Sequence, residues 1–567
     1  MARRVTEQVA ASRCIDSGDG EESDAELKNK GSESDADYEV QSDCELSTDS
    51  EIDTLDASFV DKEDIDGSSN IGDVARHIDE CIDSVMNKVH KCFVGTDGSV
   101  WHQNPSLHGR RQALNVMRAL GGLSAYGLRH CRETPISSWL LFVTGEILEL
   151  IVQCTNDKAR CMGDSFITNA EELSIFIGVT ILIGVYKGRG EPVRAIWSES
   201  EGRKCINQFM SRNRFELITK YLRFDFTSTR QQRRQQTKFA PMGAVYDLWE
   251  QQLSRPFIPY EYVTIDETLV PFRGRCSFKQ YMPSKPAKYG LKFWCLCDAK
   301  TGYCLHMKPY LGSDNGNARA KALGQQVVIE LTQRLDVGRT VVTDNFFTSL
   351  ELLRRLRERN LGLVGTIRKN RRELPSEFTA KKSEAGSVLF GFNDDATLVS
   401  YSPKKNKRVL LLSSEHTTGE IDDRTGKPQI ILTYNTSKGG VDHLDEMCGA
   451  YTSRKRTLRW PKCVFQHMID VTAYNAFILW RLATNTQNAN RRQFLKRIGA
   501  ELCGGQVDEH GNIRLNTTRV TPTPQPATVM GVRLRCRRCI RNKTVQRCHK
   551  CCDALCINCA MYKCHEC

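Results

Sequence analysis

The 567-residue sequence lacks a long apolar run. Its longest apolar stretch, residues 175–186, is shorter than the ~20 residues that a membrane-spanning helix needs, and it favours a buried helix instead. Met1-Ala-Arg-Arg is followed by polar residues and not by an apolar segment, so we expect no secretory signal. The sequence therefore predicts a protein that stays inside the cell and has no membrane partner.

One part of the chain has few basic residues and few aromatics. Residues 15–66 contain 20 Asp and Glu against 3 Lys, and almost no aromatic side chains. Such a composition does not bury enough apolar surface to fold, so we expect residues 1–110 to be an acidic, disordered N-terminal region. Two roles are open for it: a solvating tail, or a DNA mimic that competes for basic surfaces elsewhere in the chain.

The remaining residues are strongly basic. The whole chain carries a formal charge of +12, so the residues outside 15–66 together carry +29. A body this basic predicts a polyanionic partner, and nucleic acid is the usual one. The length allows two to four domains, each with its own core.

Cysteine is abundant, with 24 residues, and in an intracellular chain it favours metal ligands or free thiols over disulfides. The last 32 residues hold four Cys-x-x-Cys pairs: Cys536 with Cys539, Cys548 with Cys551, Cys556 with Cys559, and Cys564 with Cys567. Two such pairs complete a tetrahedral Zn²⁺, so the tail predicts two structural zinc ions per chain. Interleaved and sequential pairing both remain open, as do disulfides, and the spare donors are Cys552, His549 and His565.

Three short acidic segments lie in the middle of the chain. Asp266 and Asp344 follow β-branched runs typical of buried strands, and Asp442 opens a segment with helical spacing. Several carboxylates together could hold two Mg²⁺ ions roughly 4 Å apart, the arrangement used in phosphoryl transfer. The alternative is that each Asp is a turn residue or a helix cap.

The order of elements favours an α/β fold with an RNase H-like catalytic core. Strands are expected at residues 263–271, 291–297 and 303–311 as an antiparallel set, then helices and strands alternate through 327–335, 340–343, 350–360 and 362–367. Asp266 and Asp344 would then lie on neighbouring central strands. Strand-like pieces between the second and third acids predict an inserted β subdomain. Amphipathic helical patterns precede and follow this core, one of them at residues 465–482.

These patterns divide the chain as follows: 1–110, acidic region; 111–261, helical domain, first part; 262–368, catalytic domain, first part; 369–429, inserted β subdomain; 430–455, catalytic domain, second part; 456–520, helical domain, second part; 521–532, linker; 533–567, Cys-rich domain.

Basic residues surround the acids, where they would position DNA through its phosphates without reading its sequence. The candidates are Arg273, Arg275, Lys285, Lys288, Lys292, Arg368, Lys369, Arg371, Arg372, Arg454, Lys455, Arg456 and Arg459. Trp460 could stack on an unpaired base or belong to the core. Arg residues also surround the first cysteine pair, which fits phosphate contact or nuclear import.

Several motifs together resemble the piggyBac family of DNA transposases. They occur in family order from about residue 135 onward: Met210-Ser-Arg-Asn-Arg-Phe215, Ile265-Asp-Glu267, Phe272-Arg-Gly-Arg275, Tyr281-Met-Pro-Ser-Lys-Pro286, Lys288-Tyr-Gly-Leu-Lys292, Asp344-Asn-Phe-Phe-Thr-Ser349, Gly365-Thr-Ile-Arg368, Lys438-Gly-Gly-Val-Asp442 and Arg459-Trp-Pro461.

The resemblance implies a DDD/DDE-type enzyme. Asp266, Asp344 and Asp442 match the family's catalytic aspartates, and Asp445 matches a fourth acid of the same Mg²⁺ or Mn²⁺ site. The tail would be a small cross-brace zinc domain that recognises transposon-end DNA, although Cys559 stands where the best-known members have His. The resemblance also implies that the helical domain binds DNA and forms a homodimer.

The implied chemistry is cut-and-paste transposition at TTAA sites, in the nucleus, through strand cleavage, hairpin formation and strand transfer at double-stranded terminal inverted repeats and target DNA. Two alternatives are a domesticated descendant that binds DNA without moving it and, from the tail alone, a RING-like ubiquitin ligase.

Overall fold

The computed structural model describes residues 92–105, 116–131, 134–312, 323–486, 488–508, 510–515, 534–535 and 543–544. All of them belong to one compact unit that starts at Asp83. No helix in the described ranges is both long and apolar enough to cross a bilayer.

Two of the sequence predictions fall on residues that the structure does not describe. One is the disorder of the acidic segment 15–66. The other is the pair of zinc sites, because all eight predicted ligands lie outside the described residues: Cys536, Cys539, Cys548, Cys551, Cys556, Cys559, Cys564 and Cys567. Both therefore stay predictions.

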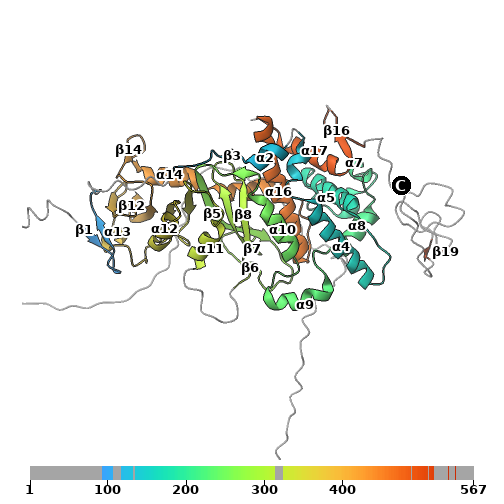
Figure 1. Cartoon of the computed structure of the whole chain (residues 1–567), viewed down its shortest axis with the longest axis horizontal. Helices are drawn as coiled ribbons and strands as arrows, with labels where there is room; N and C mark the ends of the chain where they lie inside the picture. Colours follow the sequence, from blue (N-terminus) through green and yellow to red (C-terminus); the bar gives the residue numbers. More distant parts are fainter. Residues whose placement is uncertain are drawn as a thin grey trace, which may run out of the picture. The chain divides into compact units, whose positions relative to one another are not determined.

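A twisted mixed sheet forms the centre of the described unit (Figure 1). Strands β5 (Tyr262–Pro271), β7 (Tyr289–Asp298) and β8 (Cys304–Pro309) pair antiparallel, as the sequence predicts. Strands β9 (Thr340–Thr343) and β10 (Gly362–Thr366) then add in parallel on the other side of β5. Strands β5, β9 and β10 are rich in β-branched residues, and most side chains of all five strands are buried, as expected of a sheet covered on both faces.

Helices make the crossovers that parallel strands require. Helix α11 (Leu323–Leu331) leads into β9, and α12 (Leu350–Arg357) connects β9 to β10. Ser349 caps α12 by accepting from the backbone N–H of Leu352, and four leucines of α12 are buried. The alternating order expected from the sequence is therefore present.

The segment between the second and third acids forms strands that extend the same sheet. Strands β11 (Val388–Phe392), β12 (Thr397–Lys404) and β13 (Lys407–Ser413) follow one another antiparallel, and β13 pairs with β10. The sequence predicts these strands correctly, but β11, β12 and β13 of the inserted segment 369–429 join the central sheet, and only a short two-stranded pair of the segment lies outside it. The edge of β10 offers unpaired backbone groups, and β13 satisfies them.

A hairpin near the described start of the unit completes this end of the sheet. Strands β1 (Cys92–Val94) and β2 (Val100–His102) pair antiparallel, and β2 pairs with β11. Trp101 is fully buried and its indole N–H donates to the carbonyl of Glu373 at 2.9 Å. The expectation of disorder through residue 110 is therefore wrong for residues 92–102, because the acidic composition behind it ends well before Phe93 and Trp101.

Helices surround the sheet and form a second, helical region. Their bounds are α2 (Ala125–His130), α3 (Pro135–Trp139), α4 (Gly145–Cys161), α5 (Ala170–Val185), α6 (Val193–Ile196), α7 (Lys204–Asn207), α8 (Arg212–Tyr221), α9 (Thr227–Gln236), α10 (Gly243–Leu253), α13 (Ser376–Thr379), α14 (Gln429–Ser437), α15 (Gly440–Ala450), α16 (Trp460–Thr484) and α17 (Arg491–Leu502). Short strand pairs complete the described elements: β3 (Gly122–Leu123) with β4 (Phe257–Ile258), β6 (Gln280–Tyr281) with β7, β14 (Ile421–Asp422) with β15 (Lys427–Pro428), β16 (Gly505–Val507) with β17 (Ile513–Leu515), and β18 (Leu534–Arg535) with β19 (Lys543–Thr544).

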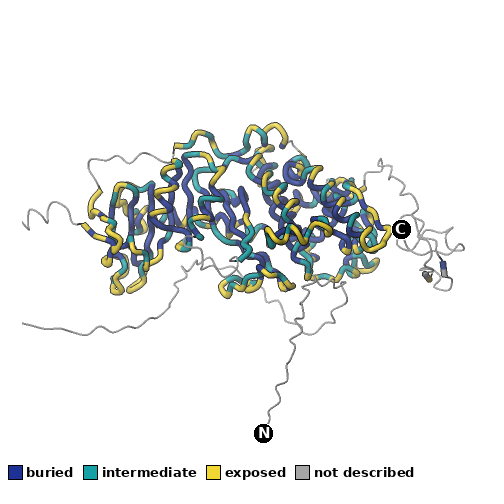
Figure 2. Tube along the Cα trace, turned by 60° about the horizontal axis from the view of Figure 1, so that its bottom comes forward, coloured by how far each residue is buried: buried dark blue, intermediate teal, exposed yellow. Residues whose placement is uncertain are grey.

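Helices from before and after the sheet pack together in the helical region. Helix α17 packs on α5, and α16 packs on α3. Their contact surfaces belong to the same apolar core as the sheet, and Figure 2 shows the central strands and these helices largely in the buried colour. Residues 135–161 form two helices, because α3 ends at Trp139 and α4 begins anew behind the capping side chain of Thr144.

Candidate active site

Two of the three predicted acids lie level with each other on adjacent strands. Ile265 of β5 pairs with Thr343 of β9 in parallel register, so the next positions, Asp266 and Asp344, are neighbours. Asp344 ends its strand, and its side chain accepts from the backbone N–H of Phe346 at 2.9 Å. Asp266 lies within β5 and accepts from the backbone N–H of Glu267 at 2.7 Å. Both side chains are partly buried.

Helix α15 brings the other two acids to the same face of the sheet. Asp442 is exposed in its first turn, and Asp445 lies one helical turn further, partly buried. The hydroxyl of Thr268 donates to a carboxylate oxygen of Asp445, and that of Thr264 donates to the carbonyl of Ser437 at 2.7 Å. Residues 264, 266 and 268 share one face of β5, so the two threonines that flank Asp266 anchor the end of α14 and the middle of α15.

A glycine permits the close approach of α15 to the strand. A Cβ added at Gly440 would lie 2.9 Å from the hydroxyl oxygen of Thr264 and 3.1 Å from the carbonyl oxygen of Asp298. These distances are tighter than ordinary contacts of a Cβ, so a larger residue would push the helix and its acids outward.

Burial and mutual repulsion shift the pKa values of the acids. Burial, the neighbouring Glu267 and Asp344 raise the pKa of Asp266 to about 8. Burial raises the pKa of Asp445 to about 6, against the hydrogen bond from Thr268, and burial also raises the pKa of Asp344. Such a cluster of desolvated carboxylates favours a cation among them.

Two lysines reach this cluster from β7 and the loop before it. The ammonium group of Lys285 donates to the carbonyl of Glu267 at 3.3 Å. Burial opposes its charge, but the carboxylates of Asp266, Glu267, Asp442 and Asp445 outweigh burial and raise its pKa. Lys292 pairs with Glu267 at 3.4 Å and lies 3.8 Å from the ring centre of Trp294. Both residues were predicted to hold DNA, and the structure adds these contacts with the acids.

Glu267 is a site residue that sequence reasoning did not assign. It acts on the pKa values of Asp266 and Asp344 and pairs with Lys292. Its position directly after Asp266 was the available signal, but in a strand adjacent side chains point to opposite faces. The ion pair between Lys292 and Glu267, which the sequence does not reveal, shows that Glu267 belongs to the charge network of the site.

The chemical type of the candidate ligands suits a hard divalent cation. All of them are carboxylate oxygens, which Mg²⁺ and Mn²⁺ prefer, and a cation would reverse the upward shift in their pKa values. Within the described ranges, no three acids, histidines or cysteines stand close enough together to hold a metal ion as they are.

The predicted DNA-holding residues fall into two groups. Seven are exposed: Arg273, Arg275, Lys288, Arg368, Lys369, Arg372 and Arg456. Four others contact the protein itself. Three donate hydrogen bonds to backbone carbonyls: Arg371 to Thr348 at 3.2 Å, Lys455 to Gly188 at 3.0 Å, and Arg459 to Thr219 at 2.9 Å. The fourth, Arg454, forms an ion pair with Asp470 at 3.9 Å.

Trp460 is a core residue. It is 9% exposed and its ring lies 5.4 Å from that of Phe239 and 5.0 Å from that of Phe278. In this arrangement the ring is buried against aromatic neighbours, as the core alternative expects, and its stacking on an unpaired base stays a prediction.

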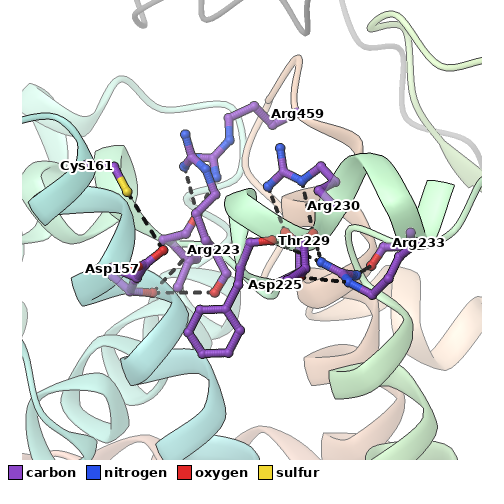
Figure 3. Close-up of polar contacts among 12 residues, drawn as sticks. Asp157, Cys161, Arg223, Asp225, Thr229, Arg230, Arg233 and Arg459 are labelled. Carbon is purple, nitrogen blue, oxygen red and sulfur yellow. Dashed lines mark hydrogen bonds and ion pairs between the residues drawn. The ribbon is translucent and has the colours of Figure 1, made fainter.

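A basic cluster at α9 was not assigned from the sequence. Figure 3 shows the guanidinium groups of Arg230 and Arg233 turned toward the buried carboxylate of Asp225. Arg230 donates to both carboxylate oxygens, at 2.7 and 2.9 Å, and Arg233 donates at 2.7 Å. Helix α9 buries none of its side chains, so this ion-pair network fixes its first turns.

Comparison with known proteins identifies the family. Residues 134–477, more than half of the chain, match the family model described as Transposase IS4. A solved structure of the piggyBac transposase synaptic complex with hairpin DNA is 33% identical in sequence, with a TM-score of 0.64, and the match covers 68% of this chain and 83% of that one. The chain belongs to the piggyBac family of transposases.

Curated relatives within the piggyBac family include two human proteins. PiggyBac transposable element-derived protein 3 is 26% identical over 462 residues, which cover 76% of each chain. PiggyBac transposable element-derived protein 2 is 24% identical over 400 residues, 66% of each chain. The mixed parallel and antiparallel sheet described above agrees with the α/β fold of the family.

Proposed function

We propose that this piggyBac-family protein is an active cut-and-paste transposase whose divalent-metal site consists of Asp266, Asp344, Asp442 and Asp445. The observation that carries the proposal is the pairing of Ile265 with Thr343, which places the first two acids side by side, while Thr268 ties Asp445 to the same strand. A set of four carboxylates on rigid elements is what phosphoryl transfer requires.

The chemistry follows from charge and position. Bound Mg²⁺ or Mn²⁺ ions, two per site, would activate an attacking oxygen and neutralise charge on the phosphate. Asp266 and Asp344 would supply oxygen ligands from the sheet, and α15 would supply those of Asp442 and Asp445. Lys292 holds Glu267, and the exposed Arg273, Arg275 and Arg368 would position the phosphate backbone.

The same proposal extends to substrate and assembly. The related synaptic complex contains hairpin DNA, which supports double-stranded DNA as the substrate, with a hairpin between cleavage and strand transfer at TTAA. We assign recognition of the terminal inverted repeats to the Cys-rich tail with two Zn²⁺, and place the protein in the nucleus as a homodimer.

A second candidate function is DNA binding without transposition. The names of the human relatives, transposable element-derived proteins, favour it, since they describe chains derived from such elements. The four acids at the candidate site favour the active enzyme.

The deciding experiment is a cleavage assay with purified full-length protein, Mg²⁺, and DNA carrying the inverted repeats that flank its coding region, bounded by TTAA. We expect strand cleavage by the wild type, and loss of at least about 10³-fold for Asp266→Asn and Asp344→Asn with end binding preserved. Tight binding of the ends by the wild type without any cleavage would favour the second candidate. Cleavage retained in either variant would show that other acids are used.

A further inference from the structure

The hairpin formed by β1 and β2 is held in place by one of its two faces. Phe93 and Trp101 pair across the two strands, and both side chains are buried. The ring of Phe93 lies edge-on to that of Phe378 at 5.2 Å, and the indole N–H of Trp101 donates to the carbonyl of Glu373 at 2.9 Å. This inner face fixes the hairpin on the sheet, so the places of the outward side chains are fixed with it.

The outer face of the hairpin carries a cysteine next to a histidine. Side chains alternate along a strand, so the residues on either side of Phe93 and Trp101 point outward. Cys92 and His102 stand directly opposite each other in the antiparallel register, and both are exposed. The sulfur of Cys92 lies 3.3 Å from Nδ1 of the His102 ring, close enough for a hydrogen bond. The two side chains therefore form a Cys–His pair at the surface.

The next outward residues leave this pair open to solvent. Val94 and Val100 stand opposite each other beside it and are 57% and 44% exposed. Their side chains carry no charge and neither donate nor accept hydrogen bonds. Of the four outward side chains of β1 and β2, the imidazole of His102 is therefore the one that can take a proton from the thiol.

A second exposed cysteine provides a contrast. Among the cysteines that the structure describes, Cys92 and Cys161 are the two that are exposed. The sulfur of Cys161, at the end of α4, lies 3.9 Å from a carboxylate oxygen of Asp157 (Figure 3). An imidazole that accepts the thiol proton becomes positive and stabilises the thiolate, whereas a carboxylate repels it. The surroundings of Cys92 thus favour the thiolate, which is the reactive form of cysteine, and those of Cys161 oppose it.

We propose that Cys92 is a redox modification site, at which His102 activates the thiol for exchange with a small disulfide such as glutathione disulfide. The imidazole takes the thiol proton, and the sulfur of Cys92 attacks one sulfur of the small disulfide. The sulfur–sulfur bond of that molecule breaks as the new one forms, and the leaving thiolate receives the proton from His102. Cys92 is thereby oxidised to a mixed disulfide, and the released half is reduced to a thiol. The step needs no metal and is independent of the proposed function.

The test is incubation of the full-length protein with glutathione disulfide at neutral pH, with acid quenching at intervals and mass spectrometry of the peptides. We expect Cys92 to acquire glutathione at least about tenfold faster than Cys161. In His102→Gln, the rate at Cys92 should fall by about tenfold, while the rate at Cys161 stays unchanged. Dithiothreitol should release the glutathione and restore the thiol. Because each peptide is measured separately, the cysteines elsewhere in the chain do not enter the comparison.

Two controls separate this chemistry from a change in structure. His130→Gln replaces another exposed histidine, whose ring contacts that of Tyr126, and should leave the rate at Cys92 unchanged. His102→Gln should unfold at the same temperature as the wild type, since the exposed ring lies outside the core. If this variant does not fold, the comparison of Cys92 with Cys161 in the wild type decides the question alone. Equal rates at these two cysteines, or an unchanged rate at Cys92 in folded His102→Gln, would overturn the proposal.

Discussion

At the residue scale, the site depends on hydroxyl groups that position the acids. Thr268 is buried on β5, two residues after Asp266, and it donates to Asp445 on α15. The hydrogen bond connects a strand to a helix 177 residues away in sequence. Under the proposed function, this hydroxyl would hold a metal ligand in place and would be as much part of the site as the ligand itself.

Replacing Thr268 by Val should therefore lower DNA cleavage by about tenfold or more, since Val keeps the shape but leaves Asp445 without its donor. The free energy of unfolding should change by only about 1–2 kcal/mol. Cleavage kinetics together with thermal unfolding measure both effects, and Thr268→Ser, which restores the hydroxyl, should recover most of the rate. Equal rates for Thr268→Val and the wild type would show that Asp445 needs no such anchor.

A partly buried histidine, His416, gives the stability of the folded protein a pH dependence. Burial lowers the pKa of His416 to about 4, against the opposing charge of Glu420. Its ring nitrogens lie 2.8 Å from the hydroxyl of Ser413 and 3.2 Å from that of Thr433. The unfolded chain would protonate this ring near its ordinary pKa of about 6.5, whereas the folded chain does not, so the unfolded state binds more protons between these values.

Stability should therefore fall as pH drops from about 6.5 toward 4, by about 2–3 kcal/mol from this residue alone. His416→Gln removes this titrating ring. As the pH falls through that window, the unfolding free energy of the variant should therefore decrease less than that of the wild type. Urea unfolding at several pH values measures it. His130→Gln, which alters an exposed histidine of α2, serves as control and should run parallel to the wild type. A constant difference for His416→Gln would refute the assignment.

At the element scale, the packing of α17 on α5 connects the part of the chain before the sheet with the part after it. The two helices meet at glycines: a Cβ added at Gly178 would lie 2.7 Å from the carbonyl oxygen of Gly499 and 2.7 Å from the sulfur of Cys503. Small residues let the helix backbones approach closely, and the apolar side chains around them are buried.

We expect Gly178→Ala to destabilise the protein by about 1–3 kcal/mol, because the added methyl group forces the two backbones apart. Gly145→Ala is the matched control: it also lies in a helix, α4, but nothing lies within 4 Å of its added Cβ, so its stability should stay within about 1 kcal/mol of the wild type. Denaturant unfolding compares the two. Equal stability of both variants would mean that the helices can separate without cost.

At the scale of the whole molecule, the proposed zinc tail and the α/β unit should respond separately to metal removal. The four Cys-x-x-Cys pairs occupy only the last 32 residues, too few to bury a core of their own without metal. Treating the protein with a strong zinc chelator should weaken binding of the inverted repeats by at least about tenfold, while the unfolding temperature of the larger unit changes little.

Gel-shift titration and calorimetric unfolding before and after chelation measure this, and added Zn²⁺ should restore binding. End binding that is unaltered in chelator would contradict the zinc assignment, and disulfides would then be the better interpretation of the pairs.

Local patterns were sufficient for much of the fold. The runs before Asp266 and Asp344 predict their strands because β-branched side chains favour a buried, pleated surface, and the structure confirms both. Long-range pairing was not accessible in the same way. That β13 joins β10, or that the hairpin at Phe93 and Trp101 joins β11, depends on which edges remain unpaired after the core has formed.

The sequence by itself determined the family and the order of the strands, and it named the four candidate acids, because motifs and side-chain periodicity are properties of neighbouring residues. Only the tertiary structure decided that Trp460 is buried in the core, that Thr268 donates to Asp445, and that Lys285 reaches the backbone carbonyl of Glu267. These are contacts between segments far apart in the chain. Burial and distance, which set their energies, exist only once the sheet and α15 have come together.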